Sequence, residues 1–61
     1  MDGGVEEAKR MLEETINLAR KLYGRKWMTV VEELEDMYDG DPWAVLEHLR
    51  REAARRGLSA P

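Results

Sequence analysis

The sequence contains no cysteine, so the chain can form neither a disulfide nor a thiolate metal site. Proline occurs twice and glycine five times among the 61 residues, fewer than a disordered chain usually carries. No apolar run is longer than a few residues, whereas a membrane-spanning helix needs about 20. These absences exclude a disulfide-stapled scaffold, a zinc–thiolate domain and a transmembrane segment.

The chain is short and mildly acidic, with 61 residues and a formal net charge of −3. A chain of this length forms one domain, which we place at residues 1–61, near the lower size limit for folding without staples. The negative charge argues against general attraction to nucleic acid or to anionic membranes. The opening MDGG lacks the basic and apolar pattern of a signal peptide, so we expect none, and the sequence assigns no compartment.

Side chains suited to catalysis or metal binding are sparse. His48 is the only histidine, and we expect it to face solvent on the side of its helix opposite Leu46. One outward imidazole cannot hold a structural metal ion. The acidic residues between Glu32 and Asp41 do not follow the register of a calcium loop, and no glycine-rich phosphate loop occurs. We therefore expect no enzyme activity, no cofactor and no metal site.

The longest helical pattern in the chain covers residues 5–23. Its apolar residues recur at three- and four-residue spacing, which places them on one face of a helix. This stripe consists of Val5, Ala8, Leu12, Ile16, Ala19 and Tyr23. Met11, Leu18 and Leu22 lie to one side of the stripe and widen the apolar arc to about 160°, which two neighbouring helices would cover. Gly24 is predicted to close the helix in the left-handed conformation.

A second helical pattern covers residues 27–39. Its apolar residues fall within an arc of about 120°, and they are Trp27, Val30, Val31, Leu34, Met37 and Tyr38. The start of this helix has two interpretations. Trp27 shares the apolar stripe and favours a start at residue 26 or 27, which we prefer. Thr29 and Glu32 have the spacing of a capping box, which would start the helix two residues later.

A third helical pattern covers residues 42–56 and follows the clearest turn signal in the chain. Gly40 is predicted to end the preceding helix, Asp41 to cap the next one, and Pro42 to take its first position. The residues predicted to point inward are Trp43, Leu46, Leu49 and Ala53. Gly57 should end this helix, with the chain folding back onto its last turn.

Together these patterns predict an all-α protein folded as a single up-down-up three-helix bundle, because short loops force neighbouring helices antiparallel. The ends, residues 1–4 and 58–61, are expected to fray. The predicted core consists of Leu12, Ile16, Ala19, Val31, Leu34, Leu46 and Leu49. The same topology gathers acidic residues at one pole of the bundle and basic residues at the other.

Several apolar residues exceed what the simplest core requires, and we predict that they bind another protein. Methionine and other large apolar side chains at the edge of a helix stripe are suited to protein interfaces. The predicted contact residues are Met11, Leu18, Leu22, Met28 and Val45. The competing interpretation is that Met11, Leu18 and Val45 pack against the second neighbour of each helix.

The style of the whole chain resembles that of de novo designed three-helix mini-proteins. The resemblance rests on helix and loop lengths, on GDP before the last helix, and on the segments EEAKRMLEE and LRREAARRG. Such scaffolds serve mainly as miniature binders of a chosen protein, so the resemblance implies a partner protein and carries over no site residues. The chain departs from this style in its Gly-Gly start and in the segment YGRKWMTV.

Two other functions remain open on the sequence. The patterns at residues 27–39 and 42–56 are joined by a tight turn, as in a helix-turn-helix that contacts DNA, although the acidic start of the second would repel phosphate. Alternatively, a second copy of the chain covers the spare apolar surface. We favour a monomer whose partner is another protein, with neither nucleic acid nor a membrane as partner.

Overall fold

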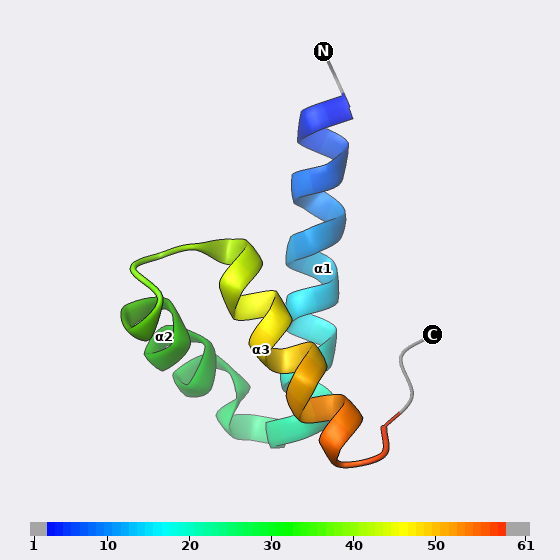
Figure 1. The fold of residues 1–61 in the computed structure, drawn as a ribbon, viewed down its shortest axis with the longest axis vertical. Helices are drawn as coiled ribbons and strands as arrows, with labels where there is room; N and C mark the ends of the chain where they lie inside the picture. The colour runs from blue at the N-terminus through cyan, green and yellow to red at the C-terminus, as the bar shows by residue number, and fades with distance from the viewer. Residues whose placement is uncertain (1–2, 59–61) are drawn as a thin grey trace.

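The computed structural model describes residues 3–58, and every regular element in this range is helical (Figure 1). The elements in chain order are α1 (Gly3–Tyr23), the short 3-10 helix η1 (Gly24–Lys26), α2 (Trp27–Met37) and α3 (Pro42–Arg55). η1 follows α1 directly and α2 follows η1 directly, whereas a turn separates α2 from α3. The prediction of an all-α protein is confirmed.

The observed helix bounds differ from the predicted ones by two residues or fewer. α1 includes Gly3 and Gly4, so helical backbone reaches further toward the N-terminus than predicted. Residues 1–2 and 59–61 of the expected frayed ends lie outside the described range. α2 begins at Trp27, as preferred, and Thr29 lies inside the helix instead of capping it. These differences leave the order and type of the elements unchanged.

The chain reverses direction between α1 and α2 at Gly24. This residue has a φ of 60°, the left-handed conformation predicted for it. A side chain with a Cβ atom would be strained at this φ, so glycine allows α1 to end here without a loop. The three residues of η1 then lead directly into Trp27.

The end of α2 is a Schellman motif whose left-handed residue is Asp39. The Gly40 N–H donates to the Glu35 carbonyl at 2.7 Å, and the Asp39 N–H donates to the Asp36 carbonyl at 3.4 Å. Asp39 has a φ of 57° and Gly40 a φ of 75°. The sequence predicted that Gly40 alone would end this helix, whereas the structure places an aspartate in the first left-handed position.

We expect Asp39→Gly to raise the free energy of unfolding by about 0.5–1 kcal/mol. The left-handed conformation costs a residue with a Cβ atom about 1–2 kcal/mol, partly offset by the greater freedom of glycine in the unfolded chain. The change also removes a negative charge from a helix C-terminus. Urea unfolding followed by circular dichroism measures the effect. Asp39→Asn is the control, since it removes the charge and keeps the Cβ atom; equal stability of both variants would contradict the backbone explanation.

Both ends of α3 have the caps that the sequence predicts. The Asp41 carboxylate accepts a hydrogen bond from the Trp43 N–H at 3.0 Å, and Pro42 is the first helical residue. At the other end, the Leu58 N–H donates to the Ala53 carbonyl at 2.9 Å, so the chain folds back onto the last turn. Local sequence alone therefore sets where α3 begins and ends.

α1 and α3 lie side by side and run in the same direction (Figure 1). Two contacts set their register: Arg50 pairs with Glu14, and further along Arg56 donates to the Leu22 carbonyl at 2.9 Å. α2 runs between the end of α1 and the start of α3. The first turns of α1 project beyond the other helices, and residues 4–10 are all exposed.

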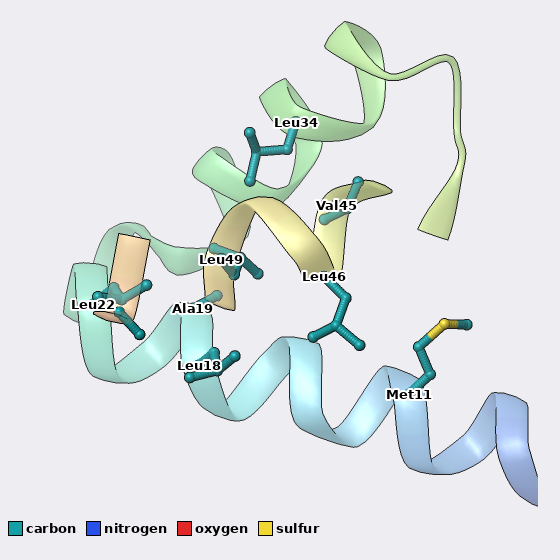
Figure 2. Packing of buried hydrophobic residues seen from close by; sticks show 9 residues of the cluster. Met11, Leu18, Ala19, Leu22, Leu34, Val45, Leu46 and Leu49 are labelled. Atoms are coloured by element: carbon teal, nitrogen blue, oxygen red, sulfur yellow. The ribbon is translucent and has the colours of Figure 1, made fainter. Parts of the chain in front are cut away.

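The core lies where α1, α2 and α3 face one another, and its side chains point together in Figure 2. The buried apolar residues are Met11, Leu18, Ala19, Leu22, Leu34, Val45, Leu46, Leu49 and Ala53. The predicted core is right for Ala19, Leu34, Leu46 and Leu49. It is wrong for Leu12, whose side chain is 56% exposed, and only partly right for the half-buried Ile16 and Val31.

The error in the predicted core comes from the orientation of α1 about its own axis. α3 packs against the edge of α1 formed by Met11, Leu18 and Leu22, so this edge is buried and the N-terminal part of the predicted stripe turns away. Val5 and Leu12, at the N-terminal half of the stripe, are exposed as a result. Trp43 was predicted to point inward and is also exposed. The edge of α1 that was predicted to bind a partner is therefore buried, and part of the stripe that was predicted to be core is exposed.

Candidate protein-binding surface

A groove lies between α1 and α2, closed at one end by the start of α3. Its volume is about 200 Å³. We call it the α1–α2 groove, and its lining residues are Leu12, Thr15, Ile16, Trp27, Val31, Glu35, Pro42 and Val45. Most of these side chains are apolar, and Leu12, Ile16, Trp27 and Val31 keep part of their surface in contact with solvent.

The α1 wall of the groove is the exposed part of the predicted core stripe. Leu12 and Ile16 stand one turn apart on this wall. Ala8 and Val5 continue the same line toward the N-terminus, and the Val5 side chain is 70% exposed. We call this line of four residues the α1 strip; its N-terminal part, Val5 and Ala8, extends beyond the groove because α1 has 21 residues and α2 has 11. The fold leaves the strip without a cover.

The α2 wall of the groove consists of Trp27 and Val31, both half-buried. Met28 lies one turn before Val31 on the same side of α2 and is 57% exposed, so it extends the apolar surface outward. The Arg20 guanidinium lies over the Trp27 ring at 5.1 Å from its centroid. This contact marks the end of the groove nearest the α1–α2 junction.

The one polar side chain on the floor of the groove is satisfied within α1. Thr15 is buried, and its hydroxyl donates to the Met11 carbonyl at 2.8 Å. Among residues 3–58, no buried side-chain nitrogen or oxygen lacks a hydrogen-bond partner. The floor therefore offers a ligand apolar contact and no free hydrogen-bonding group.

The rim of the groove on α2 is acidic and has no counter-charge of its own. Glu35 lines the groove, and Glu32 stands one turn before it. No lysine or arginine occurs between Lys26 and Arg50. The ion pairs of the described residues involve other carboxylates, those of Glu14, Glu47 and Glu52. The carboxylates of α2 thus face solvent unpaired.

The arginines of α3 are held by carboxylates of the same chain. Arg50 donates two hydrogen bonds to the Glu14 carboxylate, at 2.7 and 2.8 Å, and these bonds lower the pKa of Glu14. Arg55 and Arg56 both bind Glu52, and the bond from Arg55 is the main cause that lowers its pKa. A DNA-contacting helix would need these guanidinium groups free for phosphate, so the pairing weakens the helix-turn-helix alternative.

His48 is not the solvent-facing histidine that the sequence predicted. It is half-buried, and its Nδ1 atom lies 3.0 Å from the Tyr38 hydroxyl, with the two rings edge to face at 5.9 Å. Tyr38 follows the end of α2, so only the packing of α2 on α3 brings the two side chains together. Within residues 3–58, no three His, Asp or Glu side chains gather where they could hold a metal ion.

The predicted contact residues divide into one that is available to a partner and four that are not. Met11, Leu18, Leu22 and Val45 belong to the core, which corrects their placement on a free surface. For Met11, Leu18 and Val45 this supports the competing interpretation given above. Met28 is exposed as predicted. The sequence held a signal for this exposed stripe: the predicted helices 5–23 and 27–39 already differ in length by about 9 Å at ~1.5 Å per residue, and the observed α1 and α2 differ by about 15 Å.

A second hollow lies along the polar side of α1 and has a volume of about 640 Å³. Its lining residues are Arg10, Glu13, Glu14, Asn17, Leu18, Arg20, Lys21 and Arg50. Four basic and two acidic side chains line it, and Glu14 already pairs with Arg50. Apart from Leu18 the lining is polar or charged, so the apolar α1–α2 groove is the better candidate for a protein contact.

Comparison of the chain with protein-family models, with curated proteins and with solved structures finds no match. In the range that the structure describes, no helix combines the length and the apolar character needed to cross a membrane. The proposals below start from the groove, its exposed apolar side chains and its unpaired carboxylates.

Proposed function

We propose that the chain is a non-catalytic protein-binding module whose partner contacts the α1–α2 groove. The observation that carries the proposal is the line of exposed apolar residues that runs from Val5 through Leu12 into the groove. Contiguous apolar surface of this kind, rimmed by charged residues, is typical of protein interaction sites. Met28 on α2 adds a flexible side chain that adapts to an irregular partner surface.

The scaffold for this surface, as we propose it, is an up-down-up three-helix bundle. The parallel course of α1 and α3 and the reversal of the chain at Gly24 support this topology. Together with the resemblance of the sequence to designed three-helix mini-proteins, it supports a module that presents one helix face to a target protein. The bundle holds the groove walls in place, which lowers the entropic cost of binding.

The chemistry of the groove supports binding without catalysis. Of the residues that the structure describes, Glu35 is the only ionisable one that lines it. General acid–base catalysis usually needs two groups whose pKa values differ, placed within hydrogen-bond reach of one substrate. His48, the only histidine in the sequence, is hydrogen bonded to Tyr38 outside the groove. We propose no cofactor, no metal and no nucleic-acid partner for this chain.

A displayed library of random helical peptides tests this proposal. We expect peptides to be enriched on the unmodified protein and on Met37→Asp, but not on Leu12→Asp. Met37 is the matched control because its side chain is 65% exposed and does not line the groove. If no peptide distinguishes Leu12→Asp from the unmodified protein, the groove is not the binding surface. Light scattering over a concentration series shows in parallel whether a second copy covers it.

A further inference from the structure

We infer that the occupant of the α1–α2 groove is an amphipathic helix of a partner protein that carries lysine or arginine beside its apolar face. This inference rests on the proposed function and specifies the chemistry of the partner. Three observations carry it: the size and shape of the groove, the unpaired carboxylates on its rim, and the charge that a second copy would bring.

The size of the groove fits side chains of a protein better than a small molecule. Its volume of about 200 Å³ is below the range of roughly 300–1,000 Å³ typical of small-molecule pockets. The α1 strip adds length: Val5 and Ile16 are 11 residues apart, about 16 Å at ~1.5 Å per residue. A partner helix with apolar residues at i, i+3 or i+4, and i+7 covers about 10 Å, so it fits along the strip.

The rim of the groove attracts positive charge. Glu35 lines the groove and Glu32 lies one turn away, and neither forms an ion pair with another residue between 3 and 58. Asp36 and Asp39 stand at the C-terminal end of α2, where the negative end of the helix dipole adds to their field. At physiological salt this field extends about 8 Å, far enough to reach side chains that flank the apolar face of a docked helix.

The opposite end of the groove limits where the basic residues of a partner can lie. The Arg20 guanidinium covers the Trp27 ring there, at 5.1 Å from its centroid. A cation placed beside Arg20 would be repelled, so the favourable contacts are confined to the end near Glu35. The partner helix should therefore carry its lysine or arginine residues toward one end of its apolar stripe.

The same charges make a second copy of this chain a poor occupant. A two-fold symmetric contact brings the same surface patch of both copies together. The rim carboxylates Glu32 and Glu35 of one copy would then approach those of the other, and no lysine or arginine of α2 would offset the repulsion. An anionic membrane surface is disfavoured for the same reason. An amphipathic basic helix would place its apolar side chains in the groove and its lysine or arginine side chains beside the rim carboxylates.

Three synthetic helical peptides test the inference directly. All carry leucine at i, i+3 and i+7, and the positions flanking one end of this stripe carry lysine, glutamine or glutamate. Trp27 in the groove wall reports binding by fluorescence, in a Trp43→Phe background that removes the other tryptophan. We expect the lysine peptide to bind about tenfold more tightly than the glutamine peptide, the effect of two or three exposed ion pairs. The glutamate peptide should bind most weakly.

Two variants of α2 with equal net charge separate a specific rim contact from general attraction. Glu35→Lys should lower the affinity for the lysine peptide by about tenfold, and Glu33→Lys should change it little. The two residues are two positions apart, so they lie on opposite sides of the helix. Both are exposed, and circular dichroism should show both variants folded. Equal losses in the two variants would overturn the inference.

The remaining outcomes separate this inference from the proposed function. If all three peptides bind equally and Leu12→Asp abolishes their binding, the groove is a protein-binding site and the basic partner is wrong. If neither the peptides nor the displayed library shows binding that depends on Leu12, the proposed function fails as well. If light scattering shows a dimer that Leu12→Asp dissociates, the occupant is a second copy and the inference is overturned.

Discussion

Replacing Leu49 with alanine should remove a large share of the free energy of unfolding of the protein. The Leu49 side chain is 0% exposed and lies at the centre of the core, among residues of α1, α2 and α3. Truncation of a buried leucine to alanine costs about 2–5 kcal/mol, from lost apolar burial and from the cavity left behind. At 0.05–0.15 kcal/mol per residue, a chain of 61 residues has a free energy of unfolding of roughly 3–9 kcal/mol.

Urea unfolding followed by far-ultraviolet circular dichroism, which reports helix content, measures this loss. Met37→Ala is the matched control, because Met37 is also a large apolar side chain in a helix but is 65% exposed. We expect this control to change the free energy of unfolding by about 0.5 kcal/mol or less. If Leu49→Ala and Met37→Ala unfold at the same urea concentration, the core described above is wrong.

The variants Leu18→Asp and Leu12→Asp should differ in folding: we expect the first to unfold and the second to stay folded. Leu18 is buried in the core, where an aspartate would lose the apolar contacts and most of its hydration, and we expect Leu18→Asp to lose its cooperative melt. Leu12 is on the same helix but is 56% exposed, so its aspartate keeps its hydration. We expect Leu12→Asp to change the free energy of unfolding by about 1 kcal/mol or less.

Thermal melts of the two variants, recorded by circular dichroism, show which of the two leucines belongs to the core. The pair is well matched, since both changes place the same residue six positions apart in the interior of α1. The apolar pattern alone predicted the reverse, with Leu12 in the core and Leu18 at an interface. A cooperative melt for Leu18→Asp and its loss for Leu12→Asp would support that assignment, and the loss of both would mean that the groove is closed in solution.

If the two variants behave as expected, Leu12→Asp becomes a clean test of binding. A variant that folds normally and fails to bind has lost contact with the partner, whereas a variant that unfolds says nothing about an interface. Met11, Leu18, Leu22 and Val45 are unsuitable for such tests because they are part of the core. Leu12, Met28 and Glu35 are the exposed positions at which substitutions report on the groove.

The amino-acid sequence by itself determined where the helices begin and end. Gly24 closes α1, and Asp41 with Pro42 starts α3, as the local pattern predicts. Capping works this way because it depends on hydrogen bonds between residues at most five positions apart. The left-handed Asp39 at the end of α2 is the exception, since aspartate and glycine compete for the same position and the pattern favours glycine.

Only the tertiary structure decided which edge of α1 is buried and which lines the groove. The apolar arc of α1 is wide enough for either edge to face α3, and the choice depends on the rotation of the helix about its axis. That rotation depends on the buried side chains of α2 and α3 that pack against α1, which lie far from it in sequence. Glu14 with Arg50 and Leu22 with Arg56 are further contacts of this long-range kind. The pairing of Tyr38 with His48 arises in the same way. Periodicity reports the width of an apolar face, and the neighbours of the helix decide how that face is shared between core and solvent.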